Sequence, residues 1–252
     1  MSPEVAHNGL WYPAGKVKRG VSMKEQPCHM SMRKAAIVAG AAYLAMFVPA
    51  IFANFFVLSG LVVEGDAATT TQNILANELL FRGGTASLLA VAVLDIVVAI
   101  GLYVFLAPAG KTLSLAGAWF RVAYSAVFAA SLTSLAMIPG LLHEAGSLGE
   151  QLQTQVLLSV NTFNTGWMVG LLLFGVHLLA IGYLAFKSGY VPRLIGVLLL
   201  IAGLGYLVDT LGFVLVPGYA LSLGQYTFIG ELAFPVWLLI RGGKESRRAS
   251  EA

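Results

Sequence analysis

The chain has 252 residues, of which 58% are hydrophobic and 11% are charged, and its mean hydropathy is +0.82. Because an ordinary soluble domain carries about 25% charged residues, this chain has too few to cover a water-facing globule. The composition excludes a soluble globular protein and predicts one compact unit embedded in a lipid bilayer.

The net charge of +3 does not indicate a nucleic-acid partner. The basic residues lie in the tails and short loops, whereas a phosphate-binding surface gathers them on one face. Cys28 is the single cysteine of the chain, which excludes an intrachain disulfide and a multi-cysteine metal site. We therefore expect no cofactor.

Three regions follow from the hydropathy pattern: a polar tail over 1–34, a membrane domain over 35–240 and a basic tail over 241–252. The first tail is polar, rich in proline and glycine, and is predicted to be disordered. The natural start of translation is left open between Met1, Met23, Met30 and Met32.

Six segments are long and apolar enough to cross a bilayer as helices, which takes about 20 residues. The fold class is therefore all-α, an integral membrane bundle. A proline at 49 predicts a kink in the first span, and another at 235 lies inside the sixth. The predicted spans are 35–63, 84–107, 113–138 (ending before Pro139-Gly140), 165–186, 192–216 and 221–240.

The Lys and Arg residues give the orientation. All of them lie on the side of the N-terminus except Arg82 and Arg121. Because basic residues are retained in the cytoplasm, both termini are predicted to be cytoplasmic, in a bacterial cell membrane. The outer loops over 64–82 and 141–164 carry apolar residues at helical spacing, which predicts short interfacial helices or outward extensions of the spans.

Charged groups inside a span cost roughly 2.5–3.5 kcal/mol each and usually face the interior of the bundle. Asp95 lies about 16 Å, and Arg121 about 12 Å, from the predicted cytoplasmic ends of neighbouring antiparallel spans. An ion pair between them is therefore expected. A structural role, in which each charge neutralises the other, is favoured over a functional one.

Three further polar residues lie in predicted spans. His177 either relays protons or, more in keeping with its isolation from other ligands, forms a neutral bond between helices. Glu231, four residues before Pro235, is evenly balanced between the discontinuous-helix site of a transporter and a protonated structural carboxyl. Asp209 lies near the outer surface, where a partly solvated structural role is favoured.

Other motifs are few. Gly166-Trp-Met-Val-Gly170 is a small-xxx-small pattern, for which close packing of helices within the chain is preferred over packing between chains. The sequence contains no nucleophile elbow, zinc-binding HExxH helix or P-loop. This absence favours a protein that is not an enzyme.

A set of short strings occurs in a characteristic order: Asn73-Ile-Leu-Ala-Asn-Glu78 with Phe81-Arg82, Gly166-Trp167, Gly175-Val-His177, Gly182-Tyr-Leu184, Ser188-Gly-Tyr-Val-Pro-Arg193, Gly203-Leu-Gly-Tyr-Leu-Val-Asp209 and Gly230-Glu-Leu232. Together they resemble the bacterial membrane family known as domain of unknown function 4386, over about 33–241. The resemblance implies a six-span membrane protein and no particular activity.

Three functions are consistent with the sequence. The first is a non-enzymatic membrane protein with a regulatory or interaction role, with a membrane protein partner or a homo-oligomer left open. The second is a small-solute or proton-coupled transporter that uses Asp95, Arg121, His177 and Glu231. The third is a membrane enzyme acting on a lipid-like substrate, with Glu231 or Asp209 as acid or base.

Overall fold

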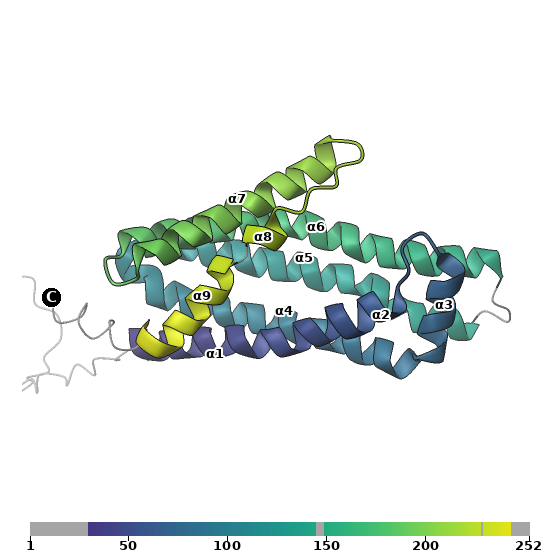
Figure 1. Cartoon of the computed structure of the whole chain (residues 1–252). Helices are drawn as coiled ribbons and strands as arrows, with labels where there is room; N and C mark the ends of the chain where they lie inside the picture. The colour runs from purple at the N-terminus through teal and green to yellow at the C-terminus, as the bar shows by residue number, and fades with distance from the viewer. Residues whose placement is uncertain (1–29, 145–148, 228, 243–252) are drawn as a thin grey trace, which may run out of the picture.

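The computed structural model describes residues 30–144, 149–227 and 229–242, and within these ranges all regular secondary structure is helical, without a β-strand (Figure 1). Five helical segments are long and apolar enough to cross a membrane: Met32–Leu61, Glu78–Ala109, Lys111–His143, Glu150–Lys187 and Arg193–Leu215. These helices confirm the prediction of an all-α bundle. The predicted tails lie mostly outside the described residues, although the first helix begins at Met32 rather than at residue 35.

The long helices pack in chain order. They are α1 (Met32–Ile51), α4 (Glu78–Leu106), α5 (Lys111–Glu144), α6 (Glu150–Lys187) and α7 (Arg193–Leu215). Each packs against the next, and the short helix α9 (Ile229–Trp237) packs against both α7 and α1. The helices therefore form a closed ring, in which α9 is the last member.

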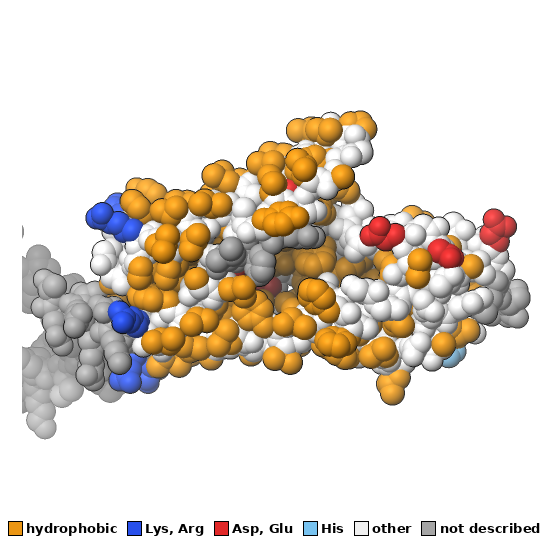
Figure 2. Space-filling view, in the orientation of Figure 1, with side chains coloured by type: hydrophobic (Ala, Val, Ile, Leu, Met, Phe, Trp, Pro, Cys, Tyr) orange, Lys and Arg blue, Asp and Glu red, His pale blue; other side chains and the backbone are white. Residues whose placement is uncertain are grey.

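The two ends of the ring differ in charge. The first and last described residues lie at the same end of the molecule (Figure 1). Figure 2 shows Lys and Arg side chains at that end and Asp and Glu side chains at the opposite one. A hydrophobic surface separates them, as expected for a protein that crosses a bilayer.

The proline at position 49 changes the geometry of the first helix. A proline inside a helix lacks the N–H donor and its ring clashes with the carbonyl four residues earlier. Three residues after Pro49, the chain adopts a π-helical segment, η1 (Phe52–Leu58), before one last α-helical turn, α2 (Ser59–Leu61). Asn54 Nδ2 donates to the carbonyl of Ala50 at 2.9 Å, which satisfies one of the disturbed acceptors. The predicted kink is therefore a π-helical stretch.

The first outer loop contains the expected short helix, α3 (Ala67–Ala76), which packs against α6. Asp66 caps its N-terminus: Oδ1 accepts from the Thr69 N–H at 2.9 Å and Oδ2 from the Thr69 hydroxyl at 2.6 Å. These hydrogen bonds favour the ionised carboxylate and hold the pKa of Asp66 below its ordinary value.

Helices α5 and α6 are longer than predicted. The predicted end of the third span at Pro139-Gly140 is wrong, because α5 continues to Glu144. Leu135, Ile138 and Leu142 are all buried, so one apolar stripe crosses the proline and packing outweighs the lost hydrogen bond. Helix α6 has 38 residues and starts at Glu150 rather than at 165, so most of the predicted outer loop over 141–164 is an outward extension of this helix, one of the two expected forms.

The sixth predicted span, 221–240, is helical only from Gly224. The elements described there are α8 (Gly224–Thr227), α9 and a π-helical segment, η3 (Leu238–Gly242), with residue 228 outside the described residues. The connection after α7 runs back beside that helix before α8 begins, and α9 starts near mid-length of the bundle (Figure 1). The last segment therefore extends along only part of the bundle, and a count of six full spans is not established.

Candidate functional site

Arg121 of α5 is the centre of a buried polar cluster. Its side chain is 1% exposed, and Nη2 lies 2.5 Å from Asp95 Oδ1 of α4, whose side chain is also 1% exposed. The ion pair predicted from the depths of the two residues is thereby confirmed. A guanidinium within an apolar bundle needs such a partner, because an unpaired buried charge would cost several kcal/mol, on the order of 3–5.

Two other helices contribute to the same guanidinium. Arg121 Nη1 donates to the hydroxyl of Tyr43 on α1 at 2.5 Å, and lies 3.2 Å from Nε2 of His177 on α6. His177 Nδ1 lies 2.8 Å from the carbonyl of Gly117, which only accepts, so Nδ1 carries the proton. Nε2 is then the acceptor for Arg121, and His177 is neutral.

Aromatic rings enclose the guanidinium. Arg121 Cζ lies 4.5 Å from the ring centroid of Tyr43 and 5.3 Å from that of Phe174, within the range of a cation–π interaction. Phe174 also contacts the rings of His177 and Tyr206. The cluster is therefore screened from water on its aromatic sides, which strengthens each electrostatic interaction inside it.

Some polar atoms of the cluster remain unsatisfied. Neither carboxylate oxygen of Asp95 has a hydrogen bond of good geometry among the described residues, despite the close contact with Arg121, and Arg121 Nε also has none. The same holds for Glu231 Oε1, in the first turn of α9. Glu231 is near enough to Arg121 and Asp95 to interact electrostatically with both. Asp95 is therefore the carboxyl group in contact with the guanidinium, and Glu231 is a second carboxyl group at longer range.

The presence of two carboxyl groups and one guanidinium in this region has a chemical consequence. In a low-dielectric interior, a second carboxylate beside an already neutral ion pair leaves an uncompensated negative charge. The cluster is neutral when it holds one additional proton, on Glu231 or on Asp95. Figure 2 shows acidic atoms within a hollow of the surface at mid-length of the bundle, beside the short last helices. The arrangement is that of a buried polar cluster near the start of the last described helical segment.

Asp209 belongs to a different structure. Its Oδ1 accepts from the Tyr219 hydroxyl and from the Leu223 N–H, both at 2.9 Å, and Oδ2 accepts from the Gly224 N–H at 2.6 Å. Partial burial, together with the hydrogen bond to this carboxylate, raises the pKa of the Tyr219 phenol above its ordinary value. Asp209 thus holds the returning connection 216–223 against α7, and none of these three bonds reaches Arg121.

Replacing Asp209 with alanine is expected to release this connection. One hydrogen bond to a charged group contributes about 1.5–3 kcal/mol, and the substitution removes three, so the loss should reach at least that range. Hydrogen exchange at the amides of Leu223 and Gly224 would accelerate. Tyr219→Phe removes a single bond and should have a smaller effect. Unchanged exchange in Asp209→Ala would contradict the role of a clamp.

Four of the five residues singled out in the sequence, Asp95, Arg121, His177 and Glu231, lie in or beside one cluster, and Asp209 does not. Tyr43 was missed. It lies on the stripe of small buried residues of α1, with Ala35, Ala36, Ala39 and Ala42, and is the one hydroxyl-bearing side chain there. Its position among these small buried residues could have indicated Tyr43 from the sequence. The described residues contain no group of three or more His, Cys, Asp or Glu side chains suited to a metal ion.

The Gly166–Gly170 pattern serves packing within the chain, as preferred from the sequence. A Cβ atom at Gly166 would lie 2.2 Å from the Ser131 hydroxyl of α5, and one at Gly170 would lie 3.4 Å from the Tyr124 ring. The pattern therefore lets α6 approach α5 near the cluster. An interface between chains is not needed to explain it.

The described fold is that of an all-helical bundle whose long helices suit a membrane, with one buried polar cluster. The chain belongs to the family described as domain of unknown function DUF4386, whose pattern it matches over residues 38–242. It is similar to an uncharacterised protein of Archaeoglobus fulgidus, with 34% identity over 160 residues, which is 64% of this chain and 84% of that one. No solved structure matches the chain. The resemblance noted from the short strings is confirmed, and the bacterial origin stays a prediction.

Proposed function

We propose that this protein is a multi-pass membrane carrier that couples the movement of a small solute to that of a proton, with Glu231 and Asp95 as the proton-binding groups. The observation that carries the proposal is a second carboxyl group, Glu231 with its buried Oε1 unpartnered, within electrostatic range of the buried Asp95–Arg121 ion pair. A carboxyl group that gains and loses a proton within the bundle is the minimal requirement for proton coupling.

The short last helical segment supports the same function. In many carriers, helices that start near the bilayer midplane place backbone and side-chain groups around the bound ion or solute. Glu231 lies in the first turn of α9, soon after the non-helical connection 216–223 has returned along α7. Proton uptake by Glu231 removes its attraction for Arg121 and so changes the force that holds α9 against the ring. Each protonation state thereby favours a different position of α9.

The proposal is tested by flux in proteoliposomes. Wild-type protein should acidify or alkalise the lumen, as reported by a pH-sensitive dye, when one member of a panel of amino acids, sugars and organic cations is added. Glu231→Gln and Asp95→Asn should lower this coupled flux to the level of empty vesicles. Glu150→Gln is the matched control, because Glu150 is exposed at the start of α6 and should leave the flux unchanged.

The result that would overturn the proposal is an absence of flux for the wild type across the whole panel, with folded protein in the vesicles. Equal flux in wild type and Glu231→Gln would also exclude the assigned coupling residue. Melting temperature in detergent separates these results from a loss of folded protein.

A second function, a non-enzymatic regulatory or interaction role, is favoured by another observation. Arg121 joins α1, α4 and α6 to α5 through Tyr43, Asp95 and His177, so most of the cluster also serves to hold the bundle together. If the wild-type protein shows no flux in proteoliposomes, the regulatory or interaction role is the better interpretation. A membrane enzyme has less support, because the described polar groups include no nucleophile paired with a base. In each case we propose the cell membrane as the location, with both termini cytoplasmic.

A further inference from the structure

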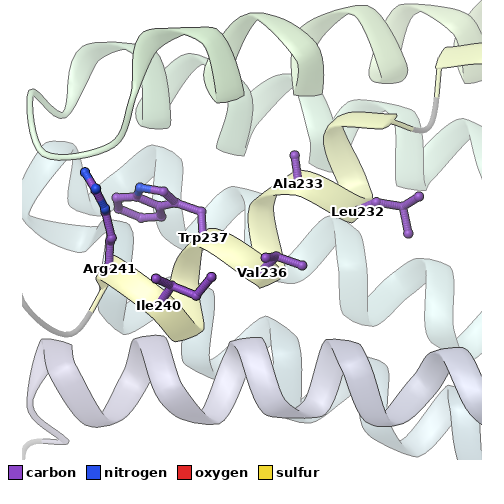
Figure 3. A pocket seen from close by; sticks show the side chains of 6 residues that line it. All are labelled: Leu232, Ala233, Val236, Trp237, Ile240 and Arg241. Carbon is purple, nitrogen blue, oxygen red and sulfur yellow. The ribbon is translucent and has the colours of Figure 1, made fainter.

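A groove with a volume of about 540 Å³ runs along the outer side of α9 and η3 (Figure 3). It is lined by Leu232, Ala233, Val236, Trp237, Ile240 and Arg241. Leu232, Val236 and Ile240 are exposed, so this side of the segment faces away from the core. All six lining residues belong to this one segment, and in a protein that crosses a membrane an exposed apolar side of a helix faces the hydrocarbon region.

The groove exists because α9 fits closely between its neighbours without covering them. A Cβ atom at Gly230 would lie 2.7 Å from the backbone carbonyl carbon of Leu198 on α7, and one at Gly40 of α1 would lie 3.1 Å from the carbonyl oxygen of Pro235. The glycines let α9 sink between α1 and α7. Figure 3 shows α9 lying between the two longer helices.

The length of the groove matches one leaflet. From Leu232 to Arg241 the segment rises by about 13 Å, at about 1.5 Å per residue. The hydrocarbon core of a bilayer is about 30 Å thick, so one acyl chain reaches about 15 Å from the headgroup to the midplane. An acyl chain placed along the groove would therefore begin near Arg241 and end near Leu232, where α9 begins.

The groove also has one charged end. In Figure 3 Arg241 lies beside the indole ring of Trp237, and that ring also packs edge-on against Phe105 of α4, with 6.2 Å between the ring centroids. Arg241 is exposed and forms no ion pair within the described part of the chain. Tryptophan and arginine are the residues that mark the headgroup level of a bilayer, and a guanidinium binds a phosphate through two parallel hydrogen bonds.

We propose that this groove binds an anionic phospholipid, with one acyl chain along α9 and the phosphate at Arg241. The charge at one end, the apolar lining and the one-leaflet length together select a membrane lipid over a soluble ligand. The site is separate from the buried polar cluster, and its occupancy does not depend on the protein being a carrier.

Native mass spectrometry of the purified full-length chain, released from nanodiscs with equal phosphatidylglycerol and phosphatidylcholine, tests this proposal. The wild type should retain one phosphatidylglycerol in preference to phosphatidylcholine, by about fivefold, which corresponds to about 1 kcal/mol for one basic residue near the headgroups. Arg241→Gln should keep a bound lipid but lose the preference. Arg193→Gln, a basic residue outside the groove with its side chain over Phe186, should keep it.

Ala233→Trp fills the groove and should lower the number of retained lipids. Because Arg241 is exposed, Arg241→Gln preserves the fold. This variant therefore tests the preference for the anionic lipid even if Ala233→Trp fails to fold. Equal retention of the two lipids by the wild type would overturn the proposal. So would an unchanged preference in Arg241→Gln, or a mass showing that a second copy of the chain occupies the groove in place of lipid.

Discussion

Replacing Arg121 with methionine is expected to lower the free energy of unfolding by about 3–5 kcal/mol. The substitution leaves Asp95 buried without its counter-ion and removes the donor to Tyr43 and His177. Methionine has a similar volume to arginine, so the loss measures the polar interactions more than a cavity. Reversible unfolding in mixed micelles provides the measurement.

The double variant Asp95→Leu with Arg121→Met is the decisive comparison. Replacing both members of a buried ion pair with apolar residues is often neutral or stabilising, so the double variant should be more stable than Arg121→Met alone. Arg82→Gln is the surface control, because its ion pair with Glu78 is exposed and should contribute only about 0–1 kcal/mol. Additive losses in the double variant would show that the pair is not coupled.

Gly196→Ala is expected to separate α6 from α7 and to cost about 1–3 kcal/mol or more, although it adds only one methyl group. A Cβ atom at this position would lie 2.6 Å from the backbone nitrogen of Phe186 and 2.9 Å from the carbonyl oxygen of Gly182. Backbone atoms cannot rotate away as side chains do, so the two helices must move apart. The melting temperature in detergent should fall.

Gly140→Ala is the matched control. Gly140 also lies in a helix, but a Cβ atom there would have no neighbour within 4 Å. Because alanine is the better helix former, this substitution should stabilise the protein by about 0.5–1 kcal/mol. If both substitutions shift the melting temperature in the same direction, close helix packing does not explain the requirement for glycine at 196.

The long helices that were predicted correctly share one property. Each is a long apolar run, and in a bilayer such a run has only the helix available to satisfy its backbone hydrogen bonds. The errors lie at proline residues. Pro139 does not end α5, because buried residues on both sides of it continue to pack. Pro235 likewise lies inside α9, and the chain becomes π-helical only after it, in η3. The packing of neighbouring residues, and not the proline alone, thus decides where each helix ends.

The candidate site was partly predictable for a similar reason. A charged group in an apolar helix needs a partner, and helix depth alone brought Asp95 and Arg121 together. Tyr43 and the aromatic enclosure were not predictable by that argument, because a tyrosine or phenylalanine costs little wherever it lies in a bundle. Asp209 was predicted as a structural group, but its partners are backbone atoms of a connection whose path no periodicity reveals.

The sequence by itself determined that this chain is all-helical, of the DUF4386 family, with helices apolar enough to cross a membrane, and which charged residues lie within those apolar stretches. Hydropathy decides these properties, since the transfer of each residue from water to lipid depends on that residue alone. Only the tertiary structure decided that α9 closes the ring as a half-helix, and that Glu231 approaches the Asp95–Arg121 pair while Asp209 does not. Those results depend on which helices are neighbours and how closely their glycines let them approach, which are properties of pairs of residues distant in sequence.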